Sequence, residues 1–345
     1  NSGSLNQAKV NIPVLKAEEV FRTIRHYFPD PDYRDYVVAY SGGRDSQVLL
    51  HIMAHLSEES GIRVRAAHFN HGLHADADRW QAFCEGICGE LGIEIVCGIA
   101  LDLSSVTANT EAEARRQRYR WLESISAPAR VVLTAHHGDD QAETFLHHLL
   151  QGKGIAQMAG VQPVRPINHG SQVNLLRPLL DYPGETLQAF ADDHQLDWIE
   201  DPSNRDTRLA RNFMRHELLP VLHQRNPGIV DALNRGARAC QIIRERENRL
   251  FDSLLDPFLR PELRGIFCRV DPLWFPDLCQ MPEWVVAGLI RHWIHRAGLQ
   301  SPGSAQFKQL SSLLKRGKEA KGVIDWDGYQ LWVFRCHLYA VSYTH

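Results

Sequence analysis

The apolar run Val37 to Tyr40 stops at Ser-Gly-Gly, and an amphipathic segment from Gln47 to Leu56 follows almost at once. This order predicts a strand, a tight loop and a helix. Paired glycines let the backbone turn sharply and approach a ligand closely. The free N–H groups of such a loop and the positive end of the helix dipole both suit phosphate. The residues predicted to bind a nucleotide are Ser41, Gly42, Gly43, Arg44, Asp45 and Ser46.

Asp45 limits the kind of ligand that this loop can bind. A carboxylate beside phosphate repels it unless a divalent cation lies between them. We therefore expect a nucleotide polyphosphate with Mg²⁺, and Asp45 as the metal ligand. The loop is not a Walker loop, which needs Gly-x-x-x-x-Gly-Lys-Ser/Thr. For a Gly-Gly pair alone, the alternative is an ordinary turn before a helix.

Strands and helices alternate through the first half of the chain. After the opening strand, further strands are predicted at 63–69, 93–100 and 130–135, and helices at 76–91, 111–124 and 139–150. A helix at 12–35 precedes them. This alternation is typical of an α/β fold with a doubly wound parallel sheet, Rossmann-like in layout. In such sheets ligands bind at the carboxyl ends of the strands.

The alternation lapses after Gly152, and the second half has another character. A short strand at 175–180 is interrupted by Arg-Pro, and a helix at 184–194 follows. Later helices are predicted at 229–255, 283–297 and 304–316, and 322–340 is predicted as a β-hairpin turning at Asp327-Gly328. The second domain should therefore be smaller, mainly helical, and end in the hairpin. The predicted divisions are an N-terminal extension (1–33), a catalytic domain (34–226), a linker helix (227–255) and a C-terminal substrate-recognition domain (256–345).

Composition excludes several classes of protein. At 345 residues, two or three domains are expected. There is no apolar run of about 18 residues and no signal peptide, so no membrane span is expected. Seven widely spread cysteines favour reduced thiols and a cytosolic location. Cys84 and Cys88 are the only close pair, and buried thiols are favoured over a metal site. The net charge is −3, so any nucleic acid must be held by a local basic patch.

Polar residues follow two of the strands. The stretch 68–74 holds three histidines, which we interpret as a polar loop at the nucleotide edge, with a metal site as the alternative. In the stretch 134–144, His136 and Asp140 lie four residues apart and can face one point above the sheet. A histidine and a carboxylate there can hold a cation, orient a nucleophile or move a proton. For Asp139, capping of the helix is the alternative to a functional role.

Arginines gather in two places. Arg115 lies in the helix at 111–124, either on a solvated basic face or within reach of phosphate or RNA. Arg208, Arg211 and Arg215 keep spacings of three and four, so they form one stripe of a predicted helix. That stripe is either solvated or a cradle for RNA beside the nucleotide site.

Several motifs now coincide. They are Ser-Gly-Gly-Arg-Asp-Ser at 41–46, His-Gly-Leu at 71–73, the helix from Glu111 to Tyr119, the stretch 134–144, Arg-Pro-Leu-Leu at 177–180, Trp-Ile-Glu-Asp-Pro-Ser-Asn at 198–204 and Arg-Asn at 211–212. The first resembles the loop of N-type ATP pyrophosphatases (PP-loop proteins). Together they resemble the tRNA(Ile)-lysidine synthetases, closely over 34–226 and in layout only beyond.

The resemblance implies a ligase. That family joins lysine to C2 of the wobble cytidine of tRNA(Ile) with a CAU anticodon. ATP first adenylates the C2 oxygen and releases pyrophosphate, and the amine then displaces AMP. Carried onto this chain, the loop would bind ATP and Mg²⁺, and Asp45, Arg115, His136 and Asp140 would be catalytic. Lining the path to lysine and the anticodon loop would be Asn204, Arg205, Arg208, Arg211 and Arg215.

Two departures from the family pattern stand out. The loop at 151–157 reads Gln-Gly-Lys-Gly, so its basic charge has moved, and its contact with RNA is in question. Longer members carry a further small C-terminal domain before which this chain is expected to stop. The alternative functions are a cytidine thiolase of the same superfamily and an RNA-binding module that binds ATP without chemistry. The thiolase would want a Cys-x-x-Cys pair, which the sequence lacks.

Overall fold

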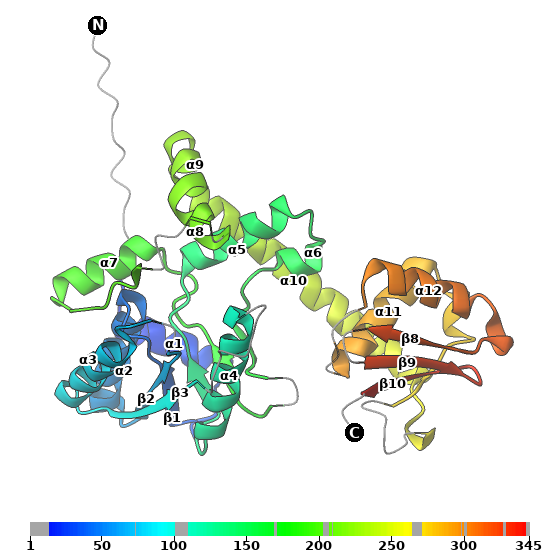
Figure 1. Ribbon diagram of the computed structural model, residues 1–345, viewed down its shortest axis with the longest axis horizontal. Coiled ribbons are helices and arrows are strands. Elements are labelled where there is room, and N and C mark those ends of the chain that lie inside the picture. Colours follow the sequence, from blue (N-terminus) through cyan, green and yellow to red (C-terminus); the bar gives the residue numbers. More distant parts are fainter. Residues whose placement is uncertain are drawn as a thin grey trace, which may run out of the picture. The chain divides into compact units, whose positions relative to one another are not determined.

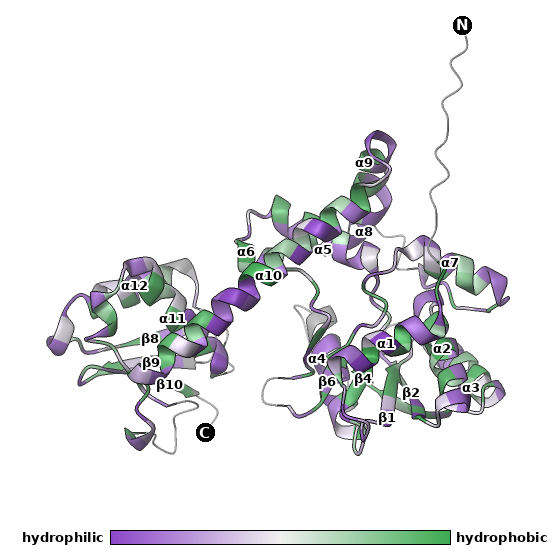
Figure 2. Ribbon diagram, turned by 180° about the vertical axis from the view of Figure 1, so that it is seen from behind, coloured by the Kyte–Doolittle hydropathy of each residue, from purple (hydrophilic) through white to green (hydrophobic). Residues whose placement is uncertain are grey.

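The computed structural model describes residues 14–72, 74–100, 110–168, 171–202, 207–208, 210–263, 271–297, 299, 302–326 and 329–342. The chain divides into two compact units, residues 1–241 and 242–345 (Figure 1). The division falls inside helix α10 (Ile229–Leu255), the helix that the sequence predicts as a linker. Figure 2 shows that α10 carries both hydrophobic and hydrophilic residues along its length.

A six-stranded sheet forms the centre of the first unit, in the order β3-β2-β1-β4-β6-β5. The strands are β1 (Asp35–Ala39), β2 (Arg63–Asn70), β3 (Glu94–Ile99), β4 (Val131–Leu133), β5 (Val164–Pro166) and β6 (Asn174–Leu176). All neighbours are parallel except β5, which runs antiparallel to β6. The predicted doubly wound sheet is confirmed. The sequence analysis did not predict β5, because three residues that end in proline carry no clear strand pattern.

Helices cover both faces of this sheet. On one face lie α1 (Ala17–Tyr27), α2 (Arg44–Ser60), α3 (Ala77–Glu90) and α7 (Gly184–Asp193), whose apolar residues pack with Tyr36 and Val38. On the other face α4 (Thr110–Ile125) packs its Leu122 with Val37. The alternation of Tyr36, Val37 and Val38 between the two cores is the two-residue period of a strand buried on both sides.

A group of helices lies at the carboxyl edge of the sheet. It comprises α5 (Gly138–Leu150), α6 (Ile155–Met158), α8 (Ala210–Phe213), a π-helical turn (Met214–Leu218) and α9 (Leu219–Arg225). Leu146 of α5 packs with Met214 and Leu219 in a small apolar cluster. This packing brings the arginine-bearing segment after residue 210 alongside the first turns of α5.

The second unit contains a four-stranded antiparallel sheet in the order β7-β10-β9-β8. Its strands are β7 (Leu273–Trp274), β8 (Gly322–Trp326), β9 (Tyr329–Phe334) and β10 (His337–Ser342). Helices α11 (Glu283–Arg296) and α12 (Ser304–Leu314) share its core around the buried Trp293. The predicted hairpin is present as β8 and β9, extended by β10. Its turn at 327–328 lies outside the described residues.

The one close pair of cysteines lies in the first unit. Cys84 and Cys88 are free thiols fully buried in the core, as predicted. None of the helices described here is both long and apolar enough to cross a membrane.

Gly98 of β3 allows α4 to pack closely on the sheet, and this contact is testable. A Cβ at Gly98 would overlap the indole ring of Trp121. We expect Gly98→Ala to lower the free energy of unfolding by about 1–3 kcal/mol, because overpacking forces the ring and backbone apart. The measurement is urea denaturation followed by circular dichroism.

Gly86 supplies the matched control. It lies in the middle of α3, and a Cβ there would meet nothing within 4 Å. Gly86→Ala should therefore raise the free energy of unfolding by up to about 1 kcal/mol, through helix propensity alone. Equal effects of the two substitutions would refute the close contact with Trp121.

Candidate active site

The phosphate-binding loop predicted from the sequence joins β1 to α2 at the carboxyl edge of the sheet. Its two serines are linked, with Ser41 Oγ 3.0 Å from Ser46 Oγ. Ser46 Oγ also accepts from Ser41 N (3.2 Å) and donates to the Gly43 carbonyl (2.9 Å). These bonds hold the loop closed across the start of α2, so that the N-terminal N–H groups of that helix face the loop's interior.

The packing around Gly42 explains part of the sequence motif at 198–204. The φ angle of Gly42 is +81°, and a Cβ there would lie 2.5 Å from Ile199 Cδ1 and 3.0 Å from Cys84 Sγ. Ile199 N donates to the Gly42 carbonyl at 2.9 Å. The segment around Ile199 therefore docks directly on the phosphate loop. Part of the motif at 198–204 is thereby accounted for by packing.

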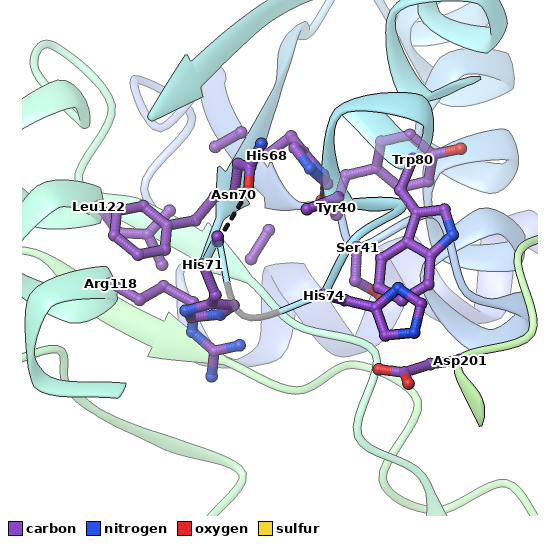
Figure 3. A pocket seen from close by; sticks show the side chains of 15 residues that line it. Tyr40, Ser41, His68, Asn70, His71, His74, Trp80, Arg118, Leu122 and Asp201 are labelled. Carbon is purple, nitrogen blue, oxygen red and sulfur yellow. Dashed lines mark hydrogen bonds between the residues drawn. The ribbon is translucent and has the colours of Figure 1, made fainter. Parts of the chain in front are cut away.

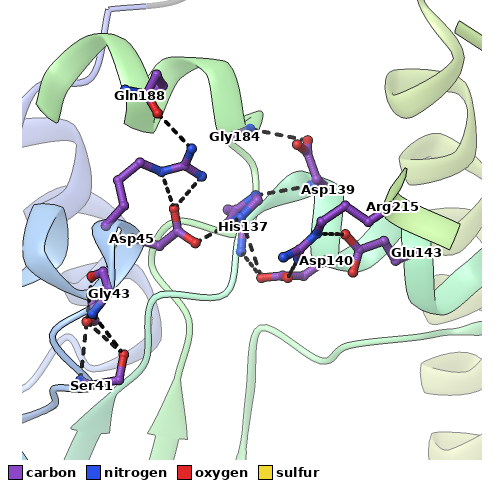
Figure 4. A network of polar contacts seen from close by, with 12 residues as sticks. Ser41, Gly43, Asp45, His137, Asp139, Asp140, Glu143, Gly184, Gln188 and Arg215 are labelled. Atoms are coloured by element: carbon purple, nitrogen blue, oxygen red, sulfur yellow. Dashed lines mark hydrogen bonds and ion pairs between the residues drawn. The ribbon is translucent and has the colours of Figure 1, made fainter. Parts of the chain in front are cut away.

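Asp45 is an ionised carboxylate held between two basic side chains (Figure 4). Arg44 donates to Asp45 Oδ1 from Nε (2.8 Å) and Nη2 (2.7 Å), and His137 Nε2 lies 3.4 Å from Asp45 Oδ2. Burial alone would raise the pKa of Asp45. The hydrogen bond and charge of His137, together with Arg44, outweigh it and lower that pKa to about 2.

The other nitrogen of His137 caps helix α5. His137 Nδ1 accepts from Asp139 N at 3.3 Å, and Asp140 Oδ2 accepts from His137 N at 2.9 Å, which completes a capping box. Asp139, for which capping was the alternative, accepts from Gly184 N at 3.2 Å and so caps the start of α7. Burial opposes protonation of His137, but Asp45, Asp140 and Asp139 together raise its pKa above the ordinary value.

Asp140 and Glu143 form a buried acidic pair bound by two arginines. Arg211 contacts Asp140 Oδ1 (2.6 Å) and Glu143 Oε2 (2.8 Å). Arg215 contacts Asp140 Oδ1 (3.2 Å) and Glu143 Oε1 (2.6 Å). The Glu143 side chain is only 1% exposed. Burial would raise the pKa of Asp140, but the charges of His137 and Arg211 lower it, so that Asp140 meets the arginines as an anion.

His136 faces the same group of charges. Its Nδ1 lies 3.0 Å from Thr134 Oγ1. Burial lowers the pKa of His136, and the positive charges of Arg177, Arg211 and Arg115 lower it further against the opposing charge of Asp140. The imidazole is therefore neutral at neutral pH. The predicted residues Arg115, His136 and Asp140 thus lie within electrostatic reach of one another.

A cavity of about 350 Å³ opens beside the phosphate loop. Its walls come from the ends of β1 and β2, the start of α3, and α4 (Figure 3). The histidine-rich stretch supplies His68, His71 and His74, with Trp80 beside His74 and Arg118 beside His71. The described residues contain no cluster of three or more histidine, cysteine, aspartate or glutamate side chains able to hold a metal. The three histidines line this cavity, and their interpretation as a polar loop at the nucleotide edge stays a prediction.

Three further residues predicted for the site are Asn204, Arg205 and Arg208. Asn204 and Arg205 lie outside the described residues. Arg208 lies exposed in a turn before α8, so the stripe predicted for Arg208, Arg211 and Arg215 is not one continuous helical face. The sequence analysis missed His137 and Glu143. Glu143 follows Asp140 by three residues, and that spacing places both carboxylates on one face of a helix.

Comparison with known proteins agrees with this architecture. Residues 16–222 match the family model of a PP-loop domain, and residues 274–339 match that of a TilS substrate binding domain. The solved structure of the U34-tRNA thiolase NcsA from Methanococcus maripaludis superposes with a TM-score of 0.53 over 65% of this chain and 78% of that one. At 19% identity that likeness concerns the fold alone. The fold and the loop thus define a PP-loop nucleotide-binding protein.

Comparison with curated relatives identifies the family within the PP-loop proteins. The tRNA(Ile)-lysidine synthase of Alkalilimnicola ehrlichii is 40% identical over 303 residues, 87% of this chain and 65% of that protein. Those of an Enterobacter species and of Legionella pneumophila are 36% and 31% identical, over 90% and 96% of this chain and 71% and 72% of their own lengths. The chain belongs to the tRNA(Ile)-lysidine synthase family. It spans about two thirds of the length of these relatives.

The raised pKa of His137 makes a pH-dependent contribution to stability. Because the folded-state pKa lies above the ordinary 6.5, this contribution is fully present below about pH 6.5 and is lost as pH rises through the folded-state pKa. Asparagine also caps helices but does not titrate. We expect His137→Asn to cost about 2 kcal/mol at pH 6 and progressively less at higher pH. Chemical denaturation at several pH values measures the difference, and a difference independent of pH would contradict the raised pKa of His137.

Proposed function

We propose that this chain ligates lysine to C2 of the wobble cytidine (position 34) of tRNA(Ile) with a CAU anticodon. The reaction consumes ATP and yields lysidine, AMP and pyrophosphate by way of an adenylated cytidine. The observation that carries the proposal is the direct contact between Asp45 of the phosphate loop and His137, which begins the helix bearing Asp140 and Glu143. A nucleotide site and a cation-binding acidic pair are thus adjacent, in a chain of this family.

The phosphate loop and the neighbouring cavity suit ATP. The loop would take the phosphates, and the cavity of about 350 Å³ would take the nucleoside. Asp45 fits a Mg²⁺ ion, because Mg²⁺ is commonly held by one or two carboxylates together with substrate phosphates. Its carboxylate is ionised and 33% exposed, so it can receive a hydrated ion. When bound, the ion would neutralise phosphate charge as the α–β bond breaks.

The first step activates the base. The cytidine C2 oxygen attacks the α-phosphorus, a new O–P bond forms, and pyrophosphate leaves. Arg44 and the N–H groups at the start of α2 would stabilise the charge on the departing phosphates. Arg115, exposed on α4 and within electrostatic reach of His136, would bind the phosphate that remains on the base.

The second step needs a neutral amine next to the activated carbon. The lysine nitrogen bonds to C2, the C2–O bond breaks, AMP leaves with the oxygen, and the amine gives up a proton. Asp140 and Glu143 would hold the lysine ammonium in place of an arginine guanidinium. The lowered pKa of Asp140 makes it an anchor for that charge and a weak base, because its own affinity for a proton is small.

The second unit would hold the large substrate. Its match to a substrate binding domain supports this assignment for the C-terminal region predicted at 256–345. Arg208, Arg211 and Arg215, with Asn204 and Arg205, would line the path to the anticodon loop, where unstacked bases are recognised by hydrogen bonds and stacking. The location would be the cytosol, where ATP, lysine and tRNA meet. A cytidine thiolase has no specific observation in its favour.

Labelled lysine tests the proposal directly. Protein incubated with ATP, Mg²⁺, labelled lysine and CAU isoleucine tRNA should place the label on the wobble base, as read by nuclease digestion and chromatography. The same tRNA with uridine at the wobble position is the control and should stay unlabelled. Sulfur uptake from a donor without lysine incorporation would identify a thiolase.

Asp45→Asn keeps the size of the side chain but removes its charge. We expect AMP formation to fall by about a hundredfold or more, because the cation loses its only carboxylate in the loop. Asp35→Asn is the matched control. Asp35 pairs with the exposed Arg63 at the amino end of β1, on the opposite edge of the sheet. If both variants form AMP at the normal rate, Asp45 is not the metal ligand.

A further inference from the structure

Tyr119, on helix α4, is surrounded by arginines from three separate segments of the first unit. The guanidinium carbons of Arg115, Arg118 and Arg165 lie 5.4, 5.3 and 5.1 Å from the centre of its ring. Arg115 Nη2 also donates to the Tyr119 hydroxyl at 3.2 Å. Arg177, which follows β6, is near enough for its charge to act on the phenol. Tyr119 itself is 7% exposed.

Among the described residues, this arginine cluster (Arg115, Arg118, Arg165 and Arg177) has no carboxylate paired with it. Within the described part of the chain, none of its members forms an ion pair with a carboxylate, whereas Arg211 and Arg215 each contact two. Arg177 is 4% exposed. Its Nη1 donates to the Gln162 carbonyl at 2.5 Å, but its buried Nε has no hydrogen-bond partner. A buried charge without a counter-charge and a buried donor without an acceptor both cost stability.

The direction in which the pKa of Tyr119 is shifted agrees with this local excess of positive charge. Burial would raise the pKa of Tyr119, yet the four arginines lower it from 10.0 to about 8. Burial, opposed only in part by Tyr119 and Asp140, lowers the pKa of Arg177 to about 10. A potential that stabilises a phenolate also stabilises any other anion bound at the same place.

The cluster is open on one side. Arg115 is exposed, Arg118 and Arg165 are half-buried, and only Arg177 is enclosed. Arg118 also lines the cavity beside the phosphate loop, where Figure 3 shows it next to His71. An anion approaching from solvent would therefore meet Arg115 first, with Arg118 and Arg165 partly accessible beside it. Guanidinium groups bind phosphate oxygens in a bidentate manner, which favours a phosphate ligand.

We infer that the arginine cluster around Tyr119 is a binding site for a phosphate group, supplied by the backbone of the RNA substrate close to the cytidine. The site lies between the nucleotide cavity and the charges that surround His136, which is where the proposed function needs the target nucleotide to be held. The inference rests on that proposed function for the source of the phosphate. It adds Arg165, Arg177 and Tyr119 to the residues that position the RNA.

Fluorescence anisotropy of a labelled CAU anticodon stem-loop, at a series of potassium chloride concentrations, tests the inference. We expect Arg165→Gln and Arg177→Met each to weaken RNA binding about tenfold and to reduce the slope of log K against log salt by about one. Arg177→Lys, which keeps the charge, should recover part of the affinity. Arg120→Gln is the matched control, since Arg120 is exposed on the same helix outside the cluster. ATP affinity, measured by calorimetry, should change less than twofold.

The outcomes separate the source of the phosphate from the existence of the site. If the variants lose ATP affinity and keep RNA affinity, the site stands and its phosphate belongs to ATP. If neither affinity nor the salt slope changes, the inference is overturned, even when the wild-type protein ligates lysine. If the wild-type protein binds no RNA, the proposed function fails and the RNA source fails with it. Thermal unfolding checks that Arg177→Met is folded; if it is not, Arg165→Gln alone decides.

Discussion

The position of the site depends on one side chain that bonds in two directions. His137 contacts Asp45 through Nε2 and caps helix α5 through Nδ1. The phosphate loop follows β1 and helix α5 follows β4, and these strands are neighbours in the sheet. Because Nδ1 accepts the cap bond, the ring hydrogen lies on Nε2, and its contact with the ionised Asp45 is charge-assisted in a site where His137 is only 3% exposed. The imidazole thus fixes the loop relative to the first turn of α5.

Three acidic residues in the first two turns of α5 make different contacts. Asp139 caps α7, which packs against α2 beneath the loop. Asp140 closes the cap of its own helix with one oxygen and meets Arg211 and Arg215 with the other. Glu143, one turn further along, shares the two arginines. Helical geometry alone assigns these roles, since residues three apart share a face while adjacent residues diverge.

The parts of the molecule that follow local pattern were predicted from the sequence, and the parts set by long-range packing were not. The strand, glycine pair and helix at 37–56 identified the loop because each feature is local. The pattern could not show that Ile199 rests on Gly42, since the two are far apart in the chain. His136 was selected over His137 because spacing to Asp140 was the only guide. The cap that turns His137 toward Asp45 depends on backbone geometry that no residue pattern displays.

Negative and positive side chains lie in two adjoining regions of the site. This arrangement affects the protonation of the lysine amine in the proposed reaction. The acidic pair Asp140 and Glu143 is matched by arginines, whereas the arginine cluster around Tyr119 is unmatched among the described residues. The potential that lowers the pKa of Tyr119 would also lower that of an ammonium group brought near it. His136 and Asp140 both have lowered pKa values, so neither is a strong base for lysine. In the proposed reaction, Asp140 would therefore anchor the lysine ammonium rather than act as its base.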